Sequence, residues 1–121
     1  MNNSIIPFIK SFFYAFDGII QFFRSERNGR IQLLLGCATI VLSAWLHISA
    51  GEWLLVIGNI AAIISLEMVN SAVEKLCNLL HPGQHPAIKF IKDVAAGAVL
   101  WSAVCSVVIA CIVFVPKLKL L

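Results

Sequence analysis

The most restrictive feature of this chain is its last long apolar stretch, residues 94–115, which contains no charged residue. About 20 apolar residues in an α-helix are enough to cross a hydrocarbon core of ~30 Å. Across the whole chain 60% of the residues are hydrophobic and only 12% are charged. A soluble domain is usually about 25% charged. The composition therefore argues against a water-soluble domain and predicts an all-α integral membrane protein.

Three ranges have the length and apolar content of transmembrane helices: 31–48, 53–77 and 94–115. Trp45 and Trp53 flank the turn expected at 49–52, and aromatic residues are common at membrane interfaces. We expect Trp53 to open the second of these helices.

Prolines and a glycine set the other boundaries. Pro82, Gly83 and Pro86 predict a loop over residues 78–86, because these residue types interrupt helices. Pro116 is expected to end the third span. Nothing is left over for a separate soluble part, so residues 1–121 are predicted to form one domain.

Residues 5–24 are predicted to form an amphipathic helix on the membrane surface rather than a fourth span. Their polar side chains repeat at helical spacing and form one narrow stripe: Lys10, Tyr14, Asp17, Gln21 and Arg24. Ile and Phe residues cover the rest of the helix, a pattern typical of helices that lie in the interface plane.

The positive charges are distributed unevenly. Seven of the nine Lys and Arg residues precede residue 31 or surround the loop at 78–86, and the turn at 49–52 has none. By the positive-inside rule, the N-terminus and the loop face the cytoplasm. Lys117 and Lys119 depart from this rule.

The second expected span carries Glu67, Asn70 and Glu74. At about 100° per residue, Asn70 and Glu74 lie within about 60° and 20° of Glu67 on the helix surface. A charge near the bilayer centre costs at least ~2.5–3.5 kcal/mol on insertion scales, so such groups pair, bind an ion or line a polar cavity. Lys92 and Asp93, near the start of the third span, are the partners that the sequence offers.

These acids lie at different depths and suit different tasks. Glu67 is two turns deeper than Glu74, roughly 10 Å by the helical rise, and could act as a general base on a lipid hydroxyl. Glu74 and Glu26 suit a hard cation such as Mg²⁺, and Lys92 suits phosphate oxygens. These are the parts that phosphoryl transfer requires, although no Gly-rich phosphate-binding motif is present.

Two other classes of function remain open. A small proton or ion transporter could use Glu67 and Glu74, but the same helix offers only Ser65 and Asn59 as further polar groups toward its other end. A non-catalytic membrane assembly subunit would leave these acids without a task. Small residues at i+4 spacing in the third span indicate a homo-oligomer in either case: Ala98, Ser102, Ser106 and Ala110.

Two segments carry a resemblance to a known family. Residues 67–74 (EMVNSAVE) and 92–99 (KDVAAGAV) resemble the signature of the prokaryotic diacylglycerol kinase family, which includes undecaprenol kinases. The runs 14–18 (YAFDG) and 24–28 (RSERN) also fit. The resemblance implies an ATP- and Mg²⁺-dependent lipid kinase. It further implies a homotrimer in the bacterial inner membrane, with three membrane helices and a surface helix per subunit.

The same resemblance implies roles for individual residues. Glu67 matches the catalytic base and Asn70 the residue that supports it, while Glu26 and Glu74 match the ligands of Mg²⁺-ATP. The remaining matches are nucleotide contacts: Tyr14, Gly83, Gln84, His85, Lys92 and Asp93. Gly83 stands where an acid is common, which puts the outer nucleotide contacts in question. The run at 24–28 favours undecaprenol over diacylglycerol, and no nucleic-acid partner is expected.

Overall fold

The computed structural model describes residues 4–121, and this part of the chain forms four α-helices and no strand. The helices are α1 (Ile5–Ser25), α2 (Arg27–Trp45), α3 (Ala50–Leu80) and α4 (Pro86–Leu118). Three of the described helices, α1, α3 and α4, are long and apolar enough to cross a membrane. The prediction of an all-α integral membrane protein is confirmed.

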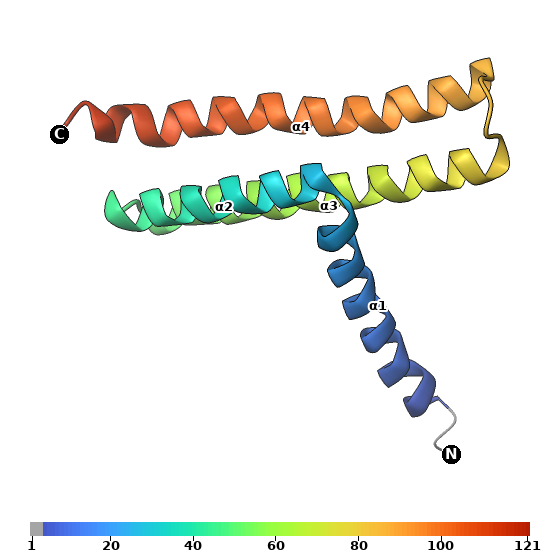
Figure 1. Ribbon diagram of the computed structural model, residues 1–121. Helices are drawn as coiled ribbons and strands as arrows, with labels where there is room; N and C mark the ends of the chain where they lie inside the picture. The colour runs from blue at the N-terminus through green and yellow to red at the C-terminus, as the bar shows by residue number, and fades with distance from the viewer. Residues whose placement is uncertain (1–3) are drawn as a thin grey trace.

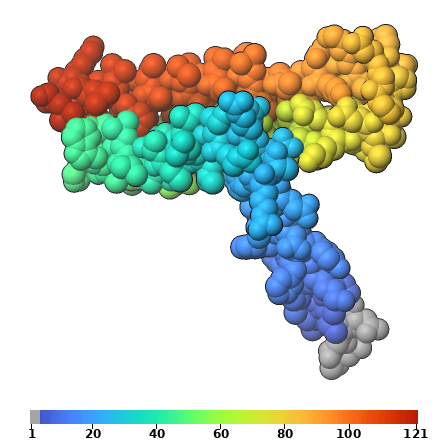
Figure 2. Space-filling view, in the orientation of Figure 1, coloured from blue at the N-terminus to red at the C-terminus, as the bar shows by residue number. Residues whose placement is uncertain are grey.

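Composition and arrangement separate the four helices differently. By composition α1 belongs with α3 and α4, whereas α2, which begins with Arg27 and Arg30, falls outside this set. In space α2, α3 and α4 run side by side, and α1 leaves them at a steep angle (Figure 1). The arrangement thus sets α1 apart from the three helices that run together. The space-filling view shows α1 as a projecting arm (Figure 2), and Phe22 is its one buried residue.

The helices differ in length, and this difference positions the later site. The 31 residues of α3 extend about 46 Å, longer than a hydrocarbon core of ~30 Å, whereas the 19 residues of α2 extend about 28 Å. α2 therefore covers only part of α3, and the α1–α2 junction lies beside the middle of α3 (Figure 1). The last turns of α3 and the first turns of α4 extend beyond the level of α1.

The turn between α2 and α3 is held by caps at both helix ends. His47 has a φ of 52°, in the left-handed region, and the N–H groups of His47 and Ile48 donate back to Ala44 and Ser43. This 5→2 and 6→1 pair of bonds satisfies the last carbonyls of α2. Ser49 and Glu52 then form a capping box at the start of α3.

This capping box corrects one sequence expectation. Residues 50–52 form the first turn of α3, so the prediction that Trp53 opens this helix is wrong. The Ser49 side chain accepts from the Glu52 N–H, and Glu52 accepts from the Ser49 N–H, which moves the helix start three residues earlier.

The loop and the last helix correct two further expectations. The α3 helix continues to Leu80, which leaves a loop of residues 81–85 instead of 78–86. Pro86 begins α4, because a proline in the first turn loses no helical hydrogen bond, and the His85 side chain caps the Ala87 N–H. Pro116 does not end α4, which continues to Leu118. In the last turn a proline removes only one bond from a helix that is about to end.

The tightest packing lies near the α2–α3 turn. Ile48, Val56, Val113 and Phe114 form a buried cluster, and the Lys117 ammonium lies 3.0 Å from the Glu52 carboxylate beside it. This ion pair ties the end of α4 to the start of α3. It also gives Lys117, which departs from the positive-inside rule, an acidic partner.

Three of the four residues in the small-residue stripe on α4 pack within the chain, and Ala110 does so against the buried cluster. Ser102 is buried, and the Ser106 hydroxyl lies 3.0 Å from Asn59 Oδ1 on α3 and 2.9 Å from the Ser102 carbonyl. Small side chains thus bring α3 and α4 together and place a polar bond between them.

Val113→Ala is expected to lower the stability of the folded protein by about 1–3 kcal/mol, because the change opens a cavity in the buried cluster. Val113 is 1% exposed. Unfolding titrations in mixed detergent micelles measure the effect. Val104→Ala on the same helix is the matched control, since Val104 is 53% exposed. Equal shifts for the two variants would contradict this assignment of the core.

Candidate active site

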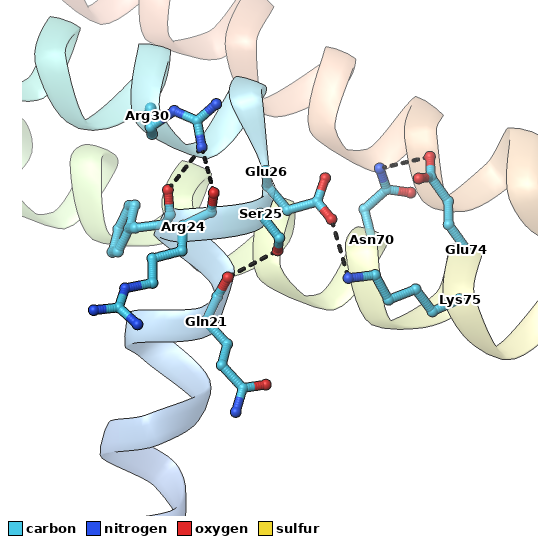
Figure 3. Close-up of polar contacts among 9 residues, drawn as sticks. Gln21, Arg24, Ser25, Glu26, Arg30, Asn70, Glu74 and Lys75 are labelled. Atoms are coloured by element: carbon cyan, nitrogen blue, oxygen red, sulfur yellow. Dashed lines mark hydrogen bonds and ion pairs between the residues drawn. The ribbon is translucent and has the colours of Figure 1, made fainter.

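Glu26 is the single non-helical residue between α1 and α2. Its backbone is extended, with φ −102° and ψ 113°, and its N–H donates to the Phe22 carbonyl at 2.9 Å. Its side chain does not cap α2. The carboxylate instead points toward α3, where Oε1 lies 3.4 Å from the Lys75 ammonium (Figure 3). The bend thus presents an acid to α3 at Lys75, five residues before that helix ends.

One face of α3, here called the acid face, carries the predicted residues Glu67, Asn70 and Glu74. Glu67 is buried, with 6% of its surface exposed, while Glu74 is exposed two turns further along the same face. The Asn70 amide lies between them in sequence, and its Nδ2 donates to Glu74 Oε1 at 3.4 Å (Figure 3). Asn70 Oδ1 is buried and has no hydrogen-bond partner within residues 4–121. A buried unpaired acceptor is costly and marks a place for a donor or a cation.

A cleft separates the C-terminal end of α1 from α3. Its volume is about 780 Å³, and its polar lining comes from both helices and the junction: Gln21, Arg24, Ser25, Glu26, Ser71 and Lys75. Ser71 is one turn from Glu67 on α3. The cleft therefore reaches α3 one turn from Glu67, and Glu67 is not among its lining residues.

A second cleft lies at the loop between α3 and α4. Its volume is about 690 Å³, and it gathers five of the residues that the sequence singled out: Gly83, Gln84, His85, Lys92 and Asp93. Lys92 Nζ bonds to Asn78 Oδ1 on α3 at 2.5 Å, whereas Asp93 pairs with Lys89 on its own helix. The Lys92–Asn78 bond fixes α4 to α3 one turn beyond Glu74.

The ten predicted site residues thus fall into three groups. Glu67, Asn70 and Glu74 lie in the C-terminal half of α3 with Glu26 beside them, and the loop group lies at its end. Tyr14 lies apart from both: it is 70% exposed on α1 and lines neither of the two clefts.

Two polar partners were missed by the sequence reasoning. Lys75 enters the sequence analysis only in the count of basic residues around the loop, yet it is the ion-pair partner of Glu26. Arg30 enters it only in the count of basic residues before residue 31, yet it bonds to the end of α1. Both contacts cross between helices, and no local pattern signals them.

The carboxylates of a single chain do not form a complete metal cage. Within residues 4–121, no group of three His, Cys, Asp or Glu side chains is placed to hold a metal ion. Glu26, Glu74 and the free Asn70 Oδ1 are nevertheless all oxygen donors, the type that Mg²⁺ prefers when phosphate and water complete its shell.

Comparison with known proteins shows which family the chain is similar to. The family model described as prokaryotic diacylglycerol kinase matches residues 13–114. An undecaprenol kinase of Bacillus subtilis is 37% identical over 116 residues, which cover 96% of this chain and 94% of that protein. A diacylglycerol kinase of a Synechocystis species is 34% identical over 113 residues, 92% of this chain and 65% of that protein. The diacylglycerol kinase of Escherichia coli K12 is 25% identical over 104 residues, 86% of this chain and 85% of that protein.

Apolar helices, a carboxylate face inside one of them and these matches together define a multi-pass membrane lipid kinase. The chain belongs to the prokaryotic diacylglycerol kinase family.

Lys92→Met is expected to raise amide hydrogen exchange in the loop of residues 81–85, because it removes the bond that fixes α4 to α3. Lys89→Met is the matched control: Lys89 also lines the loop cleft, but its partner Asp93 lies on the same helix. Hydrogen exchange read by mass spectrometry measures both variants. The same exchange rate in the two would show that the Lys92–Asn78 bond does not hold the loop end together.

Proposed function

We propose that this chain transfers the γ-phosphoryl group of ATP, with Mg²⁺, to the hydroxyl group of a membrane lipid. The observation that carries the proposal is the buried Glu67 on α3, with Asn70 and Glu74 on the same face and Glu26 presented from the junction. A buried carboxylate in an apolar helix is costly, and a task at that depth explains its retention.

The depths at which these groups would lie in the membrane suit a reaction between a lipid and a water-soluble donor. α1 marks the membrane surface, and the cleft between α1 and α3 opens beside it. Glu67 lies below this level and Glu74 about two turns closer to the loop end. A lipid hydroxyl would enter from the bilayer side, and ATP would enter from the loop side.

The chemical step is assigned to Glu67. Its carboxylate accepts the proton of the lipid hydroxyl as the hydroxyl oxygen bonds to the γ-phosphorus. The bond from that phosphorus to the bridging oxygen breaks, and ADP leaves with the electron pair. Asn70 orients the base and the transferring group. Most of the rate acceleration comes from positioning and charge neutralisation, as is general for phosphoryl transfer.

The cation is assigned to Glu26, Glu74 and the free oxygen of Asn70, whose donor chemistry fits Mg²⁺. When bound, Mg²⁺ would neutralise charge on the phosphate oxygens. Lys75 pairs with the Glu26 carboxylate, and this ion pair directs the acid at α3.

The nucleotide is assigned to the loop cleft. Lys92 supplies positive charge for phosphate oxygens, Asp93 completes the pair, and residues 83–85 form the wall against which the base rests. Tyr14 is assigned as a further nucleotide contact. Its distance from the loop cleft in one chain is consistent with a homotrimer in which α1 of one subunit reaches a neighbouring site.

The proposed setting is the bacterial inner membrane, with the N-terminus in the cytoplasm. The basic residues at the α1–α2 junction and around the loop support this orientation. Undecaprenol is the favoured acceptor, and diacylglycerol is the alternative. The undecaprenol kinase of Bacillus subtilis matches nearly the full length of the chain at 37% identity, against 34% and 25% for the two diacylglycerol kinases described above.

Glu67→Gln is expected to reduce lipid phosphorylation by at least 100-fold, since an amide cannot take the hydroxyl proton and general-base catalysis contributes about 10²–10⁴-fold. Radiolabel transfer from ATP to undecaprenol and to diacylglycerol, in separate detergent reactions, measures the loss. Glu52→Gln is the control, because Glu52 is an acid of the same helix that pairs with Lys117 at the other end. Transfer to neither lipid by the unmodified protein would defeat the proposed function, and full activity of Glu67→Gln would defeat the role of Glu67.

Glu74→Gln is expected to raise the Mg²⁺ concentration needed for half-maximal rate by roughly tenfold or more, because an anionic oxygen ligand becomes a neutral one. Mg²⁺ titrations at saturating ATP and lipid measure the change, with Glu52→Gln again as the control. An unchanged Mg²⁺ requirement would remove Glu74 from the cation site.

A further inference from the structure

The bend between α1 and α2 is made at one residue. Glu26 is both the C-terminal cap of α1 and the N-terminal cap of α2. Its backbone torsions therefore set two things together: the direction of α1 and the position of the carboxylate that reaches Lys75. Any change in the bend moves that carboxylate relative to α3.

Arg30 bridges this bend from the α2 side. Its guanidinium Nη1 donates to the Phe23 carbonyl at 3.0 Å and to the Arg24 carbonyl at 2.8 Å (Figure 3). Because α1 ends at Ser25, the carbonyls of its last turn lack the N–H partners that a longer helix would supply. A cation at this end also opposes the negative end of the helix dipole. Arg30 thus caps α1 from within the next helix.

A close contact fixes the other side of the bend. Phe22 and Gly29 are both buried, and the Phe22 ring lies where a side chain at Gly29 would be. A Cβ at Gly29 would be 2.5 Å from two atoms of that ring. Glycine is therefore required for this approach, and the ring wedges the last turn of α1 against the first turn of α2.

The two contacts act on the same bend from different residues. Phe22 precedes Glu26 by four residues and Gly29 and Arg30 follow it within four, so Glu26 is held from both sides. Neither contact involves its carboxylate, which stays free to face α3.

We propose that Arg30 is a positioning residue for Glu26: by capping α1 from within α2, it fixes the bend that holds the Glu26 carboxylate against the acid face of α3. The inference rests on the proposed role of Glu26 in the kinase site. A misplacement of about 1 Å in a reacting constellation can cost about 100-fold in rate, so a bend that is free to flex would impair catalysis without removing any reacting group.

Arg30→Gln is expected to broaden the distance distribution between α1 and α3 and to lower the rate of lipid phosphorylation by roughly tenfold or more. Pulsed electron resonance measures the distance between spin labels at positions 17 and 76, both exposed, in a cysteine-replaced background that retains activity. Labelled chains are diluted with unlabelled ones, so that only distances within a chain are read. Because Glu26 is proposed to hold the cation, the Mg²⁺ requirement should rise together with the distance spread.

Arg27→Gln is the matched control. It removes the same charge from the same segment, and the Arg27 side chain makes no hydrogen bond or ion pair within residues 4–121. It is expected to leave the distance distribution and the Mg²⁺ requirement unchanged. Arg30→Lys should restore part of the narrow distance distribution and of the low Mg²⁺ requirement that Arg30→Gln loses, since one ammonium can still donate to a helix carbonyl. Gly29→Ala, which drives the Phe22 ring away, gives a second route to the same loss if Arg30→Gln does not fold.

The outcomes separate this inference from the proposed function. A narrow, unchanged distance distribution in Arg30→Gln overturns the positioning role, and so does a broadened distribution with an unchanged rate and Mg²⁺ requirement. If the unmodified chain transfers no phosphate to either lipid, the proposed function fails. The distance measurement would still show whether Arg30 fixes the bend.

Discussion

Hydrocarbon offers no hydrogen bonds, and a charge placed in it costs at least ~2.5–3.5 kcal/mol on insertion scales. This constraint accounts for the layout of the polar groups. The Glu52–Lys117 pair lies at one end of α3 and α4, and the Lys92–Asn78 bond lies toward the other. Between them Ser106 bonds across helices to Asn59, and Thr39 and Ser43 bond to carbonyls of their own helix. The carboxylates gather on the acid face. Glu67 is the buried carboxylate that remains there, and the enzymatic proposal gives it a task.

The acid face belongs to one helix, but the site does not. Because α2 is short, the bend at its start lies beside α3 and not beyond the end of that helix. Glu26 therefore lies beside Asn70 and Glu74. α3 and α4 extend past this level and carry the loop cleft with them. In the proposed function, differences in helix length separate a lipid-side region around Glu67 from a water-side region around Lys92. A lipid kinase needs this separation, because its two substrates come from different phases.

Much of the fold and of the acid face could be predicted from the pattern of residue types along the chain. The uncharged run at 94–115 required a membrane helix, and helical spacing placed Glu67, Asn70 and Glu74 on one face, as the structure has them. Helix ends were less predictable. Pro116 was expected to end α4, but a proline in a final turn removes little, and the capping box at Ser49 began α3 before Trp53.

The order of residues is enough to predict the class of fold, the family and the acid face, because each depends on one helix or one motif. The pairing of Lys75 with Glu26, the bond from Lys92 to Asn78 and the capping of α1 by Arg30 are found only in the folded chain. Each of these contacts joins two helices, and its geometry depends on helix lengths and on a bend at one residue. Backbone torsions at Glu26 and the space that Gly29 leaves for Phe22 set that bend. Neither can be read from spacing, because spacing specifies a face of a helix and not the direction in which the next helix leaves.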